Sequence, residues 1–150
     1  MPALSHALLG LTLFGSFLIS GTPQAGAPLS IEVFSTQEFP ISGKDDRRLQ
    51  GASATEYYVD GLEHLESTLS ESLPNDAETA RAEALRRIEQ LDGAHMALAK
   101  NAAIGLAKAV QYGVARYPAI VFDGRAVVYG VTDLVEALDR HEAWQREQAR

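Results

Sequence analysis

Hydrophobic and polar positions alternate with a period of two over residues 30–35, and this pattern predicts a β-strand. A second short strand is predicted over residues 55–60, where Tyr57, Tyr58 and Val59 follow one another. The segment between them, residues 36–54, contains a proline, two glycines and a cluster of charges, so it predicts an exposed and irregular connection.

The apolar period then changes to that of helices. Leucines at positions 62, 65, 69 and 73 predict a helix that Pro74 ends. Asn75 and Glu78 resemble a capping box and predict the start of a second helix there. Its expected apolar face consists of Ala77, Ala80, Ala84, Ile88 and Leu91. Gly93 is expected to interrupt it.

A third helix is predicted between Gly93 and Gly113, with the second glycine at its C-terminal end. Its expected apolar face consists of Met96, Ala99, Ala103, Leu106 and Val110. Because several of these side chains are small, the helix is expected to pack closely against a sheet.

The last part of the chain predicts a β-hairpin and a closing helix. Two β-rich runs, 119–122 and 126–129, are separated by a short loop that contains Asp123-Gly124. Gly130 ends the hairpin, and either Thr132 or Asp133 is expected to cap the next helix. Leu134, Val135 and Leu138 form its expected apolar face. The polar tail, residues 140–150, is expected to be a helical extension that frays.

The N-terminal 27 residues have a different character. Residues 7–19 are an apolar run, and helix-breaking residues and the triplet Ala25-Gly26-Ala27 follow. This pattern predicts a signal peptide, residues 1–27, and export to the periplasm. A membrane-spanning helix needs about 20 apolar residues, so an uncleaved anchor is the less favoured reading, and a buried core helix the least. The predicted domains are the signal peptide, a folded domain over residues 28–139 and the tail.

The amino-acid composition excludes several kinds of binding and catalysis. The net charge of −7 argues against nucleic-acid binding, which needs clustered Lys and Arg. The chain contains no cysteine, so thiol redox chemistry and thiolate metal sites are excluded. Asp60 and His64 have a helical spacing that a metal pair could use, but two such residues are more often a helix-dipole carboxylate and a surface histidine. We therefore predict no catalytic residues, no metal site and no cofactor.

The segment from Tyr112 to Phe122 resembles the second half of a thioredoxin fold, in which a helix ends in a Tyr-Gly turn and an X-Pro bond precedes a strand. Gly130 and the helix after it match the same family. The resemblance implies an α/β fold with a central mixed sheet of about four strands flanked by helices. The redox pair of that family would lie near residues 35–41, where this chain has no cysteine.

Residues 31–36 and 118–133 together also resemble a narrower group: small exported proteins of integrating conjugative elements, similar to TrbC-type pilin assembly proteins. This resemblance implies a periplasmic role in a DNA-transfer apparatus of the type IV secretion class, with protein partners of that apparatus. The protein would meet a membrane only through an uncleaved signal.

The thioredoxin resemblance also implies a protein-binding groove at a cis peptide between Tyr117 and Pro118. Arg116, Tyr117 and Pro118 would form its edge, and Phe39 with Pro40 would add an apolar patch. The alternative is that Pro118 only shapes a turn and that the Phe39-Pro40 loop only covers the core.

The function expected from the sequence is that of a noncatalytic assembly or interaction factor for conjugation. Two rivals stay open: a general periplasmic peptide-binding or chaperone-like domain, and a hydrolase or metal enzyme that needs no cysteine, which the residues support poorly.

Overall fold

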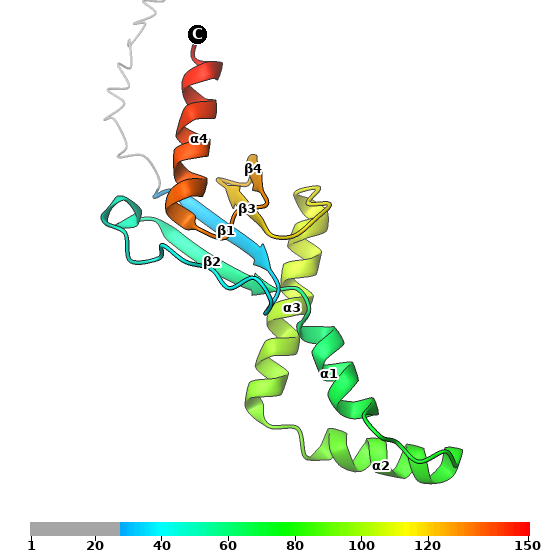
Figure 1. Cartoon of the computed structure of the whole chain (residues 1–150). Helices are drawn as coiled ribbons and strands as arrows, with labels where there is room; N and C mark the ends of the chain where they lie inside the picture. The colour runs from blue at the N-terminus through cyan, green and yellow to red at the C-terminus, as the bar shows by residue number, and fades with distance from the viewer. Residues whose placement is uncertain (1–27) are drawn as a thin grey trace, which may run out of the picture.

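The computed structural model describes residues 28–150, so the predicted signal peptide lies outside the described part. The domain has a four-stranded mixed sheet in the order β2-β1-β3-β4 (Figure 1). Its strands are β1 (Ser30–Ser35), β2 (Ser53–Tyr58), β3 (Ala119–Phe122) and β4 (Ala126–Tyr129). Its helices are α1 (Gly61–Ser70), α2 (Ala77–Glu89), α3 (Gly93–Gln111), α4 (Leu134–Gln148) and the short 3-10 helix η1 (Arg47–Leu49).

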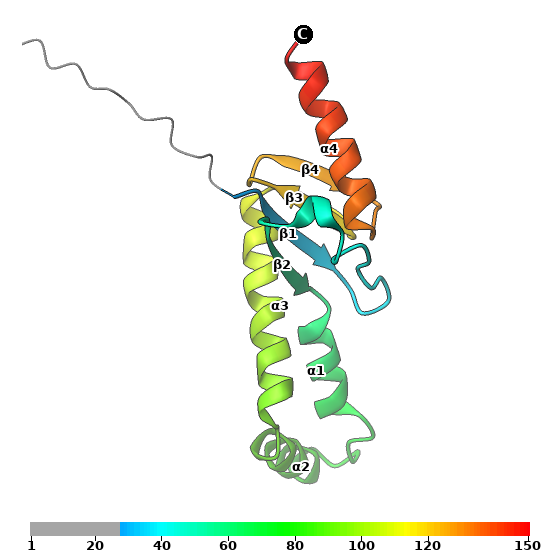
Figure 2. The same ribbon diagram turned by 90° about the vertical axis from the view of Figure 1, so that its left-hand side faces the viewer.

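The strand directions are those of a thioredoxin-like sheet, which confirms the predicted fold class. β1 and β2 are parallel, whereas β3 is antiparallel to both β1 and β4. The period-two alternation places β1 side chains on both faces: Ile31 and Val33 pack toward α4, and Phe34 packs toward α3. The sheet is therefore covered on both faces, by α3 on one side and α4 on the other (Figure 2).

The connection between β1 and β2 contains no α-helix. It is irregular, as predicted, and includes only η1, whose Leu49 is buried in the core on the α4 side. Three helices, α1, α2 and α3, connect β2 to β3. α1, α2 and the first half of α3 extend away from the sheet as a helical arm (Figures 1 and 2).

The buried face of α3 is rotated relative to the predicted one. The structure buries Ala99, Ala102, Gly105 and Ala109. By contrast, Met96 is 55% exposed, Val110 is 82% exposed and Ala103 is also exposed. These three predicted face positions were wrong, whereas Ala99 is buried as predicted. The reason is the closeness of the contact: only the smallest side chains fit where α3 crosses Tyr57 of β2.

A charged network joins β1 to α3. Glu32 is buried, and its carboxylate accepts hydrogen bonds from Lys108 and Tyr112 and from Tyr57 at 3.4 Å. Burial alone would raise the pKa of Glu32, but these hydrogen bonds and the Lys108 charge outweigh it and lower the pKa. The carboxylate is therefore ionised and fully partnered on the α3 face of the sheet.

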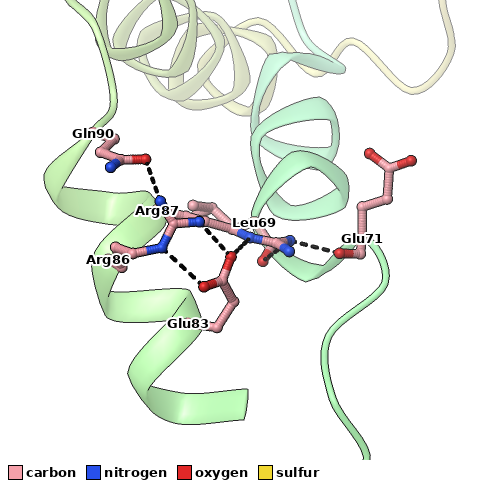
Figure 3. A network of polar contacts seen from close by, with 6 residues as sticks. All are labelled: Leu69, Glu71, Glu83, Arg86, Arg87 and Gln90. Carbon is pink, nitrogen blue, oxygen red and sulfur yellow. Dashed lines mark hydrogen bonds and ion pairs between the residues drawn. The ribbon is translucent and has the colours of Figure 1, made fainter. Parts of the chain in front are cut away.

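α2, in the helical arm, is attached by polar contacts rather than by buried side chains. α2 buries no residue, although its sequence predicts an apolar face. Its cap also differs from the prediction: Asp76, not Asn75, accepts the backbone N–H of Thr79, at 2.9 Å. The guanidinium of Arg87 ties α2 to the end of α1 by donating to the carbonyl oxygens of Leu69 and Glu71, at 3.2 and 2.6 Å (Figure 3).

The polar tail belongs to the last helix. Asp133 is the cap, and α4 continues to Gln148, so no element ends at the predicted boundary after residue 139. His141, inside the predicted tail, is 5% exposed and stacks on Phe122 with a centroid distance of 4.4 Å. Trp144 also stacks on the imidazole, with a centroid distance of 5.9 Å. The tail thus contributes to the core through one aromatic stack.

This stack predicts a pH-dependent stability. Burial lowers the pKa of His141, and the charges of Asp123 and Glu142 offset this only in part. Because an unfolded histidine has a pKa of about 6.5, acidification below that value charges the unfolded chain before the folded one, and stability falls. We expect the thermal midpoint to decrease from about pH 7.5 to about pH 5.5, above the pKa range of unfolded carboxylates.

The variant His141→Phe keeps an aromatic ring in the stack and removes the titrating group. Its thermal midpoint should therefore change less over the same interval, because the other histidines are common to both proteins. An equal decrease in the two proteins would contradict the assignment of this pH dependence to His141.

Candidate functional site

The sheet register brings the two predicted binding segments to the same end of the sheet. Phe34 of β1 lies opposite Ala119 of β3. The residues after β1, which include Phe39 and Pro40, and the residues before β3 therefore emerge at one end. We call this end, with Phe39, Pro40 and residues 116–118, the β3-entry surface.

The loop after β1 is fixed by its own hydrogen bonds. The Ser35 hydroxyl donates to the Phe39 carbonyl oxygen at 2.6 Å, and the Phe39 N–H donates to the Thr36 carbonyl oxygen at 3.0 Å. Farther along, Ser42 forms a bridge with Asp133, at the start of α4. The loop is thus attached at both ends, and Phe39 projects from a defined backbone.

The segment before β3 is fixed by a helix cap. At the end of α3 the N–H of Val114 donates to the Ala109 carbonyl oxygen at 2.8 Å, and that of Gly113 donates to Val110 at 3.1 Å. These two bonds, with Gly113 at a φ of 66°, form a Schellman motif. The predicted C-terminal glycine is confirmed, and it turns the chain toward residues 116–118.

The peptide bond between Tyr117 and Pro118 is cis, as the resemblance implied. The Pro118 carbonyl oxygen accepts the N–H of Gly130 at 3.0 Å, so the proline is joined to the exit of β4. Arg116 lies beside the same strand: its guanidinium is 4.8 Å from the centre of the Tyr129 ring.

The β3-entry surface combines exposure with rigidity. Tyr117 is 36% exposed and Phe39 is 41% exposed, although both are large and apolar. Arg116 and Pro40 are also exposed, whereas Pro118 is partly buried. The side chains of Phe39, Pro40 and Pro118 are apolar, and Tyr117 adds a second aromatic ring. These groups provide aromatic and apolar contact area with one cation, which suits binding to a protein segment.

Two further polar residues, Asp60 and His64, lie beside this surface, and the sequence analysis did not assign them to it. Asp60 follows β2, and its Oδ2 accepts the N–H of Gln37 at 2.9 Å and contacts the imidazole of His64 at 3.0 Å. β1 and β2 are parallel, so their C-terminal ends lie at the same end of the sheet. A prediction that these strands are parallel would therefore have placed Asp60 beside this surface. The Asp60 carboxylate therefore attaches the loop after β1 to the start of α1.

The side chains of Asp60 and His64, whose helical spacing was noted in the sequence, are thus in contact. Within residues 28–150, no group of three or more metal-ligating side chains comes together. Asp60 is the N-cap residue of α1, but its side chain accepts no capping hydrogen bond from a backbone N–H of that helix. Its contacts are with the loop and with an exposed histidine.

The fold and this surface define a cysteine-free, thioredoxin-like α/β domain. Comparison with known families assigns it further: the family described as "Protein of unknown function (DUF1525)" matches residues 29–147, and the chain belongs to this family. No curated protein and no solved structure matches the chain. None of the helices within the described residues has the length and apolar character needed to span a membrane.

Proposed function

We propose that this protein is a noncatalytic periplasmic assembly or interaction factor of a conjugative DNA-transfer system of the type IV secretion class, encoded on an integrating conjugative element. It would hold a protein segment of the transfer apparatus at the β3-entry surface. The resemblance of residues 31–36 and 118–133 to exported proteins of such elements supports this proposal.

The observation that carries the proposal is the pair of exposed aromatic rings, Phe39 and Tyr117, on two loops that hydrogen bonds hold in place. Large apolar side chains that are exposed on a rigid scaffold are the usual anchors of protein interfaces, because little entropy is lost when they are covered. The absence of cysteine supports recognition over disulfide exchange.

A mating assay tests the proposal. Donor cells that carry the element with this gene deleted should lose DNA transfer, and the wild-type gene should restore it. The double variant Phe39→Ala, Tyr117→Ala should restore transfer at least about tenfold less well, since truncation of a central interface anchor costs about 2 kcal/mol or more.

Met96→Ala is the matched control, because Met96 is also apolar and exposed but lies on α3 in the helical arm. It should restore transfer fully at equal protein levels. Unchanged transfer after deletion would overturn the proposal. If transfer were unchanged but the double variant lost binding to unrelated extended peptides, the general peptide-binding reading would replace it.

A further inference from the structure

β4 leaves one edge of the sheet open. It is the outermost strand on the side opposite β2, and no further strand of the described chain lies beside it (Figure 1). All four of its residues are only partly buried. An open strand edge presents unpaired backbone donors and acceptors, to which another extended segment can add.

The hydrogen-bond pattern shows which backbone groups are open. Gly130 donates to Pro118 across the β3–β4 ladder at 3.0 Å. Paired and unpaired positions alternate in an antiparallel ladder, so Val128 directs its N–H and C=O toward β3. The N–H and C=O groups of Val127 and Tyr129 therefore point away from the sheet. These two residues have the spacing at which an added strand would form its bonds.

A groove of about 430 Å³ follows this edge. It is lined by residues 125–129 and, from α4, by Arg140, His141 and Trp144. Side chains on one face of a strand occur at every second position. A groove lined by five consecutive positions must therefore run along the strand edge, where the backbone itself can be reached.

Three arginines surround the short strand. Arg125 precedes it, Arg116 lies over the Tyr129 ring at its other end, and Arg140 faces it from α4. All three are exposed, in a protein whose net charge is −7. Arg140 also contacts Glu136 at 2.6 Å. In the loop before β4, the carboxylate of Asp123 accepts a hydrogen bond from the backbone N–H of Ser30 at 3.0 Å.

We propose that the open edge of β4 binds an extended, acidic peptide segment of a partner protein as an additional strand. The Val127 and Tyr129 backbone groups would supply the main-chain hydrogen bonds, and the arginines would select carboxylate side chains. A second copy of this chain fits less well. Antiparallel pairing of two β4 edges would bring Arg125 of one copy toward Arg116 of the other, and like charges oppose that contact.

This inference goes beyond the proposed function, because it concerns the strand edge and not the exposed rings of Phe39 and Tyr117. A binding experiment tests it with the protein purified from cells that express the full-length gene. The probe is a fluorescein-labelled peptide of alternating valine and glutamate, followed by fluorescence anisotropy. We expect saturable binding that weakens with salt. The same peptide with lysine in place of glutamate should not bind.

Two kinds of change, a charge reversal in the protein and N-methylation of the peptide, distinguish the contribution of charge from that of main-chain hydrogen bonds. Arg125→Glu should weaken binding of the glutamate peptide at least about tenfold, because a like-charge contact replaces an attractive one. Arg81→Glu makes the same charge change on α2 and should leave affinity unchanged. N-methylation of alternate peptide nitrogens keeps the charges but removes strand donors, and it should abolish binding.

Amide hydrogen exchange gives an internal control. On peptide addition, exchange at Val127 and Tyr129 should slow, whereas Val128, which is already bonded to β3, should change little. Equal affinity of the N-methylated peptide, or equal weakening by Arg81→Glu and Arg125→Glu, would overturn the proposal. Slow, concentration-dependent exchange at Val127 without peptide would also overturn it, because it would indicate self-pairing of the edge.

Discussion

Replacing Phe34 with alanine is expected to destabilise the domain by about 3–5 kcal/mol, the range for buried Phe→Ala changes. Phe34 is fully buried on the α3 face of β1. Its ring stacks on Tyr57 at 5.3 Å and meets the edge of Tyr112 at 6.2 Å. The mutation therefore removes the central ring of a three-ring cluster and leaves a cavity between β1 and α3.

The loss is a large part of the free energy of unfolding, which for a small domain is about 5–15 kcal/mol. Denaturant titration should show a lower midpoint with little change in the dependence on denaturant concentration. The thermal midpoint should fall by about 10 °C or more.

Phe39→Ala is the matched control, because it deletes the same ring at an exposed position. It should change stability by no more than about 0.5 kcal/mol, although it is expected to weaken partner binding. Similar destabilisation by the two variants would contradict the placement of Phe34 in the core and of Phe39 on the surface.

The second large effect is expected from Gly105→Ala. A Cβ atom at Gly105 would lie 2.5 Å from the Cβ of Tyr57 and 3.0 Å from its Cγ. The nearest atom is attached directly to the β2 backbone, so rotation of the tyrosine ring cannot relieve the contact. α3 or β2 must shift, at a cost of about 1–3 kcal/mol, even though alanine favours a helix by about 1 kcal/mol over glycine.

Gly93→Ala is the control for this prediction. Gly93 begins the same helix, and a Cβ there would meet nothing within 4 Å. It should be neutral or slightly stabilising when both variants are compared by thermal unfolding. A Gly105→Ala protein as stable as the wild type would mean that α3 lies farther from β2 than the structure places it.

Local patterns predicted the elements well where a short stretch of chain decides its own conformation. Three such predictions are confirmed: the strand over residues 30–35, the hairpin at Asp123-Gly124 and the glycine that ends α3. Each depends on alternation or on a positive φ, such as the 50° and 65° of Asp123 and Gly124, which few residue pairs tolerate.

Cap and face assignments were less accurate, because neighbouring residues compete for them. Asn75 and Asp76 can both cap a helix, and the choice depends on the direction from which the chain enters α2. In α3, alanines and a glycine lie on most sides of the helix, so periodicity does not identify the buried side. Contact with Tyr57 identifies it.

For the candidate site, the sequence by itself determined the residue types: a Tyr-Pro step before a strand, a Phe-Pro step after another, and no thiol anywhere. Only the tertiary structure decided that these steps share one end of the sheet, because that depends on which strands pair and in which register. The same strand pairing leaves β4 at an open edge of the sheet. The packing of α4 against β3 buries His141 beside Phe122. Sequence neighbours carry no information on contacts between residues so far apart in the chain.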